Sequence, residues 1–126
     1  MAVKQATFAV LMFAALGCDP PIDVLGNVET TSGRPVAGAT VRLTCSKVPR
    51  LSRRIVTSNQ TGHFLLEEMG CLPRECTIIV RHPDGRRKAF SANEYCESTK
   101  WLACRPKYYC NKVVLRVVFS DTRTPE

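Results

Sequence analysis

The stretch from Gly33 to Leu43 constrains the fold of this chain more than any other part of the sequence. Gly33 and Gly38 give the backbone access to positive φ angles, which turns often need. Pro35 donates no backbone hydrogen bond, so it suits a corner or a sheet edge. After Gly38, apolar and polar residues alternate through Leu43, which is the pattern of a half-buried strand. Because a strand-like run at residues 22–30 precedes this corner, the stretch predicts the opening of an all-β sandwich.

Seven short segments have the composition and alternation of β-strands, at residues 22–30, 39–46, 53–58, 63–68, 76–82, 86–91 and 112–120. In the third segment we expect Ile55, and with it Thr57, to face inward. Turn residues stand between the segments, most clearly at 59–62 and 83–85. Residues 92–111 sustain no period, which indicates an irregular loop pinned by disulfides. Together these features predict a seven-stranded Greek-key β-sandwich.

The cysteine content indicates an oxidising compartment, because seven cysteines are many for a chain of 126 residues. Six of them follow residue 18: Cys45, Cys71, Cys76, Cys96, Cys104 and Cys110. These six can close three disulfides. We expect a Cys45–Cys76 bridge, from the end of one strand to the start of another, and a local bridge within the last three. Zinc is the alternative, but only Cys71 and Cys76 have the short spacing that zinc ligands favour.

The N-terminus has the pattern of an export signal. Lys4 precedes an uncharged apolar run at residues 6–16, which has the length of a signal-peptide core and is too short to span a bilayer. Residues 15–18 resemble the bacterial lipobox, whose cysteine becomes the lipidated first residue, although that motif prefers Leu where Ala15 stands. The expected division is a signal peptide at 1–17, a lipid-attachment cysteine and tether at 18–21, the sandwich at 22–120 and a tail at 121–126.

The number of cysteines also bears on Cys18. If Cys18 carries lipid, the other six can all pair, whereas a secreted chain with a free Cys18 thiol has one cysteine left over. We therefore favour a bacterial lipoprotein attached to a membrane of the cell envelope through Cys18. The alternative is a freely secreted protein in which Cys18 is free or paired.

The region from residue 28 to residue 80 resembles the carboxypeptidase regulatory-like domain, a transthyretin-like β-sandwich. The residues that carry the resemblance are Gly26, Val28, Gly33, Pro35, Val36, Gly38, Ala39, Val41, Leu43, Thr57, Gly62, Phe64 and the run from Ile78 to Val80. This chain departs from the family at Asn59, near which the family has an aspartate. The resemblance covers about half of the chain and implies a non-catalytic module, lipid-anchored or secreted.

Basic residues exceed acidic ones, and the formal net charge is +7. No acid stands between Glu29 and Glu67. Two basic groups could contact anionic lipid headgroups or acidic glycans: Arg50, Arg53 and Arg54, and then Arg86, Arg87 and Lys88. Nucleic acid is not expected as a partner, because an exported protein rarely meets it. The simpler interpretation is a solvated basic face that keeps the domain soluble.

Catalytic residues are not predicted. His63 and His82 are the only histidines, and neither stands in a pattern that supplies a nucleophile, a base and an orienting group. The C-terminal Tyr-Arg-Gly-Ser signature of transthyretin-like hydrolases is absent from the sequence. Trp101, Tyr108 and Tyr109 could form a recognition loop or pack over a disulfide.

The sequence thus predicts an exported, non-enzymatic lipoprotein with a structural or binding role at the cell envelope. No metal and no cofactor are expected, and the expected partners are the membrane and an envelope protein or glycan. A freely secreted transthyretin-like binding protein is the second hypothesis, and a small hydrolase on the same fold is the third.

Overall fold

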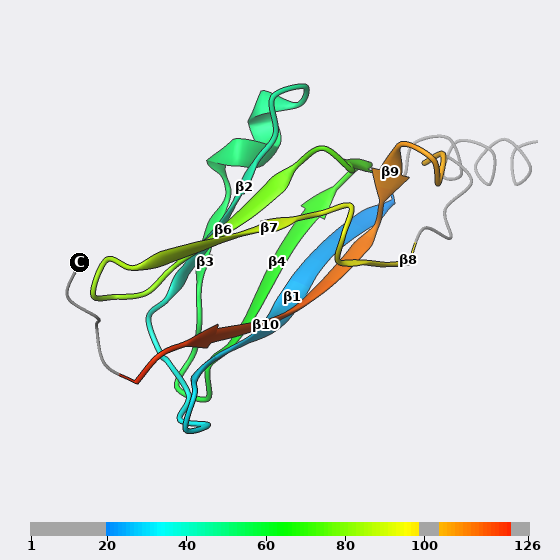
Figure 1. Ribbon diagram of the computed structural model, residues 1–126. Coiled ribbons are helices and arrows are strands. Elements are labelled where there is room, and N and C mark those ends of the chain that lie inside the picture. The colour runs from blue at the N-terminus through cyan, green and yellow to red at the C-terminus, as the bar shows by residue number, and fades with distance from the viewer. Residues whose placement is uncertain (1–19, 99–103, 122–126) are drawn as a thin grey trace, which may run out of the picture.

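The computed structural model describes residues 20–98 and 104–121, and within them the chain is mostly β with no α-helix (Figure 1). The described elements are β1 (Pro21–Thr30), β2 (Thr40–Thr44), the 3-10 helix η1 (Pro49–Arg53), β3 (Ile55–Thr57), β4 (His63–Met69), β5 (Leu72–Pro73), β6 (Thr77–Arg81), β7 (Arg87–Ser91), β8 (Cys96–Ser98), β9 (Tyr109–Cys110) and β10 (Lys112–Phe119). In this part of the chain, no helix has the length and apolar character needed to cross a bilayer.

Two four-stranded sheets and one small sheet make up the domain. The first sheet has the order β4-β1-β10-β8, the second has the order β3-β2-β6-β7, and β5 pairs with β9. The pairing of β1 with β10 is parallel, and the other strand pairs are antiparallel. Both four-stranded sheets contribute to a single apolar cluster, as expected for a β-sandwich-like fold.

Alternation along the strands builds this core. In β10, every second side chain from Val113 to Phe119 is buried, and the residues between them are wholly or partly exposed. In β2, Val41 and Leu43 are buried and the polar residues between and beside them face outward. Because burying one aliphatic side chain stabilises a fold by about 1.5–3 kcal/mol, this alternation fixes which face of each strand points inward.

The structure has more strands than the sequence predicts. Each of the seven expected segments contains a strand, and there are three further strands among the described residues. β8 and β9 lie in the segment 92–111 that was expected to be irregular, and β5 lies between two of the expected strands. β5 pairs with β9 through Leu72 and Cys110, and β8 pairs with β10 through Cys96 and Val113. Strands of two or three residues are too short to show a period, so the sequence pattern could not reveal them.

The orientation expected for Ile55 is wrong. Its side chain is 55% exposed, and Thr57 is exposed as well, while Val56 packs against the core. The register explains this, because Val56 lies opposite the buried Val41 and Ile55 lies opposite Arg42. A shift of one residue in a strand exchanges its two faces.

Three disulfides connect the strands. Cys45 is bonded to Cys76, joining the residues that follow β2 and precede β6, as the sequence suggested. Cys96 is bonded to Cys110, which is a local bridge of the kind expected, and Cys71 is bonded to Cys104. Each native disulfide typically stabilises a small exported domain by about 2–4 kcal/mol. The Cys96–Cys110 bridge joins β8 to β9, and the pairing of β8 with β10 attaches both to the sandwich.

The parallel pair gives the molecule two distinct ends. β1 and β10 both begin at one end, which we call the proximal end, and both finish at the other, the distal end. The proximal end holds Pro20, η1, β5 and β9, whereas the β6–β7 hairpin meets Ser120 at the distal end (Figure 1).

Candidate anion-binding face

Three arginines lie on the outer face of the β3-β2-β6-β7 sheet. Arg42 stands between the buried Val41 and Leu43, so strand alternation turns it outward. Arg81 follows the buried Val80 at the end of β6 and is exposed for the same reason. Arg87 begins β7 and is also exposed. We call the surface that these residues share the arginine face.

The register of the sheet brings the three guanidinium groups together. Arg81 lies directly opposite Arg87 on the neighbouring strand. Arg42 lies one row away, because its own strand places Thr40 opposite Arg81. Together with two exposed apolar positions, these side chains line a surface depression formed by Thr40, Arg42, Ile55, Ile79, Arg81 and Arg87.

Among the described residues, no acid neutralises the arginine face. In residues 20–98 and 104–121, every ion pair involves other cations, and no carboxylate lies within ion-pair distance of Arg42, Arg81 or Arg87. Like charges directly opposite each other across two strands destabilise a sheet. A guanidinium presents a planar fork of donors that matches a carboxylate, sulfate or phosphate. A bound anion would therefore reduce the repulsion between Arg81 and Arg87.

Hydroxyl groups surround the arginines on the same face. The residues that share it by register are Thr40, Thr44, Thr57, Thr77 and Ser91. Their side chains can donate and accept hydrogen bonds. Ile55 and Ile79 add an apolar surface inside the depression. Cations, hydroxyls and small apolar patches are the groups that contact an acidic sugar.

A tight hairpin holds Arg81 and Arg87 opposite each other. The backbone N–H of His82 donates to the carbonyl oxygen of Arg86 at 2.7 Å, and Gly85 N–H donates to the carbonyl oxygen of His82 at 2.9 Å. Gly85 has a φ of +100°, which residues with a side chain rarely adopt. The turn expected at residues 83–85 is therefore present, and it sets the register of the two arginines.

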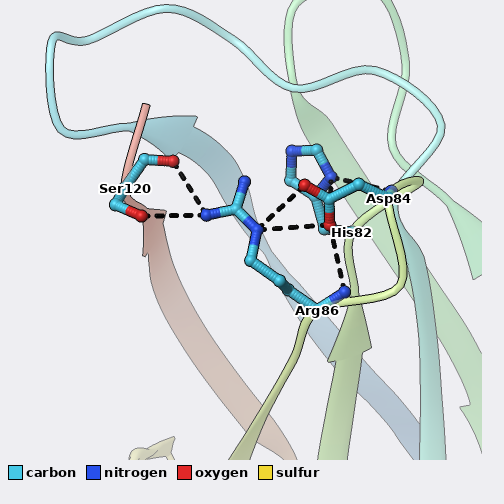
Figure 2. A network of polar contacts seen from close by, with 4 residues as sticks. All are labelled: His82, Asp84, Arg86 and Ser120. Carbon is cyan, nitrogen blue, oxygen red and sulfur yellow. Dashed lines mark hydrogen bonds and ion pairs between the residues drawn. The ribbon is translucent and has the colours of Figure 1, made fainter. Parts of the chain in front are cut away.

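A polar network fixes this hairpin to the other sheet (Figure 2). Nε of Arg86 donates to Oδ2 of Asp84 at 2.9 Å, and its Nη1 donates to the carbonyl oxygen and to Oγ of Ser120, both at 2.9 Å. The backbone N–H of Arg86 also donates to Asp84 and, together with the guanidinium, holds the pKa of Asp84 below its ordinary value. Because Ser120 follows β10, the network ties the arginine face to the distal end.

A second carboxylate at the distal end organises the turn after β1. The hydroxyls of Ser32 and Thr31 donate to Asp121 at 2.6 and 2.7 Å, and Arg34 lies 3.5 Å from the same carboxylate. Hydrogen bonds from Ser32, and then from Thr31 and Thr30, lower the pKa of Asp121 well below its ordinary range.

The structure separates the second predicted basic group. Arg86 is engaged with Asp84 and Ser120. Arg87 lies on the arginine face, and Lys88 lies on the opposite side of β7 with Nζ 5.6 Å from the centre of the Phe119 ring. Successive side chains of a strand point to opposite faces, so three adjacent cations do not make one patch.

The first predicted basic group lies around η1 at the proximal end. Arg50 donates to the carbonyl oxygen of Met69 at 2.9 Å and lies 3.9 Å from Glu68. Arg53 and Arg54 are exposed, and among the described residues neither has a carboxylate partner. The acid-free stretch of the sequence is thus partly neutralised by acids from elsewhere in the chain.

Sequence reasoning missed Arg42 and Arg81 as site residues. Neither has another lysine or arginine within three residues of it in the sequence, so neither was named in the two basic groups expected to contact an anionic surface. The signal was nevertheless present, because a turn centred on residues 83–85 places positions 81 and 87 opposite each other. Alternation along its strand turns Arg42 outward as well, but its position beside the pair depends on the register of β2 with β6.

Other predicted site residues fall elsewhere. Cys18 and Trp101 lie outside the described residues. The two histidines belong to separate networks, since His63 contacts Thr61 through Nδ1 at 2.9 Å and His82 contacts Asp84 at 3.1 Å. In the described part of the chain, no group of three or more histidine, cysteine or acidic side chains could hold a metal ion.

Comparison with known proteins gives one structural likeness to report. No protein-family model matches this chain, and no curated protein matches it either. The chain is similar to the dioxygenase domain of a dioxygenase carbohydrate-binding protein fusion from the cellulolytic bacterium Streptomyces sp. SirexAA-E, with a TM-score of 0.54 and 12% sequence identity. The match covers 81% of this chain and 80% of that one. At this identity the likeness concerns the fold alone.

Proposed function

We propose that this chain is an exported, non-enzymatic β-sandwich module that binds acidic glycans at the cell envelope through the arginine face. The observation that carries the proposal is the Arg81–Arg87 pair, held in direct register with Arg42 nearby and no acid beside it among the described residues. An acidic glycan supplies repeated carboxylates for the guanidinium groups and hydroxyls for the neighbouring threonines.

We further propose that the sandwich is a Greek-key domain of the carboxypeptidase regulatory-like kind. Two glycines of that motif support this assignment. Gly33 and Gly38 have φ angles of +86° and +79°, so the conformations that glycine favours are in use there. The three disulfides support the oxidising compartment that an exported module requires.

Attachment to the membrane through lipid on Cys18 is part of the same proposal. The intact mass of the mature protein, measured with and without reduction, counts the acyl chains and the disulfides together. A diacylated Cys18 supports the lipoprotein, whereas an unmodified N-terminus supports the freely secreted alternative.

Binding of a defined acidic glycan tests the proposed ligand. We use the mature chain from residue 18 with Cys18→Ser, and oligogalacturonate as the probe. The triple variant R42Q/R81Q/R87Q is expected to lose up to about a hundredfold in affinity, because each exposed guanidinium–carboxylate pair contributes at most about 1 kcal/mol in water. Calorimetric titration measures the change.

Two controls separate site binding from general charge attraction. The variant K47Q/R105Q/K107Q removes three exposed positive charges from the proximal end and should bind the probe almost as tightly as the parent chain. Methyl-esterified oligogalacturonate, which keeps the sugars and loses the charges, should bind weakly. Equal losses in both triple variants, or equal binding of the two glycans, would refute the proposed site.

A further inference from the structure

We infer that the proximal end is a second binding surface, and that it rests on an anionic membrane. Its orientation toward the membrane depends on the lipid attachment proposed at Cys18. The residues that carry the inference are Lys47, Arg50, Arg105, Lys107 and Tyr108, which we call the proximal basic surface. Their charges, their position at the same end of the sandwich as Pro20 and an exposed tyrosine each favour lipid headgroups as the partner.

The length of chain before the sandwich decides which end can approach the bilayer. The carbonyl oxygen of Pro20 accepts a hydrogen bond from Gly70 N–H at 2.8 Å, so Pro20 is fixed at the proximal end. Cys18 stands two residues earlier, and its Cα can be at most about 7.6 Å from that of Pro20. A tether this short brings the proximal end, and not the distal end, to the headgroups.

Cations stand next to this attachment point. Arg50 donates to the carbonyl oxygen of Met69, and its guanidinium lies directly against Gly70. Gly70 is followed by Cys71, which is bonded to Cys104, and the exposed Arg105 comes next in the chain. The same disulfide that closes the proximal end therefore places a second arginine beside Pro20.

A depression between η1 and β9 adds two lysines and a tyrosine. Its lining carries three cations and one carboxylate, from Lys47, Val48, Pro73, Arg74, Glu75, Lys107, Tyr108 and Tyr109. Tyr108 is 54% exposed, and the Lys107 ammonium lies 5.6 Å from the centre of its ring. Tyrosine favours the boundary between headgroups and acyl chains, because its ring is apolar and its hydroxyl is polar.

The arginine face stays clear of the membrane in this orientation. Arg86, which adjoins Arg87, binds Ser120 at the distal end, and β10 spans eight residues between the two ends. At about 3.3 Å per residue, this strand separates the ends by roughly 23 Å. Charges that far apart are screened from each other, since the Debye length is about 8 Å at physiological ionic strength. The two basic surfaces can thus bind different anions independently.

Vesicle partitioning of the unlipidated mature chain tests the inference. With Cys18→Ser, no acyl chain contributes, and the probes are phosphatidylcholine vesicles with and without phosphatidylglycerol. The parent chain should prefer the anionic vesicles. The variant K47Q/R105Q/K107Q should lose about a hundredfold in partitioning, because each cation near an anionic surface contributes about fivefold.

The charge-matched control is R42Q/R81Q/R87Q, which removes three positive charges from the arginine face and should leave partitioning nearly unchanged. Equal losses in the two triple variants, or no preference for anionic vesicles, would overturn the inference.

Thermal unfolding verifies that both variants fold. If the proximal triple variant does not fold, the single variants K47Q and K107Q replace it in the vesicle experiment. Each should lose about fivefold in partitioning onto anionic vesicles.

The vesicle experiment tests the proximal basic surface, and the mass of the mature protein tests the lipid anchor. Either proposal can therefore be refuted without the other. Loss of vesicle binding only in the proximal variant, with an unmodified Cys18, would keep the surface and remove the lipid anchor. A lipidated Cys18 with no preference for anionic vesicles would keep the anchor and remove the surface.

Discussion

The surroundings of each arginine decide whether its charge is available to a ligand. Arg86 and Arg87 are adjacent in the chain, yet Arg86 is paired with Asp84 while Arg87 faces solvent opposite Arg81. Arg34 and Arg50 each lie near an acid that is distant in sequence. A count of charges along the sequence therefore overstates the size of the basic clusters, and it overlooks Arg42 and Arg81.

At the scale of single residues, Asp121 leads to a prediction about how the stability of the fold depends on pH. Hydrogen bonds from Ser32 and Thr31 lower its pKa below the ordinary value of 3.8, so they favour the folded state while the carboxylate is ionised. That stability is fully present above the unfolded pKa and is lost as the pH falls through the lower folded pKa. We expect Asp121→Asn to be less stable than the parent near neutral pH, and the difference to narrow as the pH falls below 3.8.

Urea unfolding of the two chains across this pH range measures the difference in free energy of unfolding. The two chains share every other acidic residue, so the contributions of those residues cancel in the comparison. A difference between the two chains that does not change with pH would show that ionisation of Asp121 does not stabilise the fold.

At the scale of elements, Gly26 permits the close approach of β1 and β10. A Cβ at this position would overlap the backbone carbonyl oxygen of Leu115, its register partner. We expect Gly26→Ala to cost at least about 3 kcal/mol of unfolding free energy, because two central strands would have to move apart. The matched control is Gly33→Ala, which meets no atom within 4 Å and strains only a φ of +86°.

The control should cost about 1–2 kcal/mol, which is the cost of the left-handed conformation for a residue with a side chain. Urea unfolding again provides the measurement. If the two substitutions cost the same, the contact between β1 and β10 does not require glycine.

The sequence predicted the elements that have a period and missed those that do not. β2 and β10 alternate over five and eight residues, so burial and direction could be read from the residues themselves. β5 and β9 have two residues each and form through pairing and a disulfide, neither of which leaves a local pattern. The face of β3 was predicted wrongly because three residues do not fix a register without the partner strand.

The candidate site was harder to predict than the fold, because it depends on register across three strands. Arg42, Arg81 and Arg87 come from β2, β6 and β7. The expected Cys45–Cys76 bridge brings an end of β2 to an end of β6, but nothing in the sequence alone sets the register between these two strands. Only the hairpin pair could have been inferred, since the turn at residues 83–85 places Arg81 opposite Arg87. Pairing between strands distant in sequence is set by the packing of the whole core.

At the scale of the whole molecule, the two basic surfaces are proposed to bind different partners, a glycan and a membrane, at different parts of one sandwich. The parallel β1–β10 pair places the start of β1 at the proximal end and residue 119 at the distal end. In the proposed arrangement the proximal end meets the membrane, and the arginine face is held clear of it to bind a glycan. The three disulfides lie toward the proximal end, whereas hydrogen bonds to Ser120 and Asp121 hold the turns of the distal end in place.

Side-chain NMR of the arginines tests this account most directly. Titration of the mature chain with oligogalacturonate should shift the Nε–Hε signals of Arg42, Arg81 and Arg87 together, and should leave those of Arg50 and Arg86 in place. Signals that shift mainly at Arg86 or at the proximal end, or no shift at all, would contradict the proposal that the unpaired arginines of the sheet face bind the ligand.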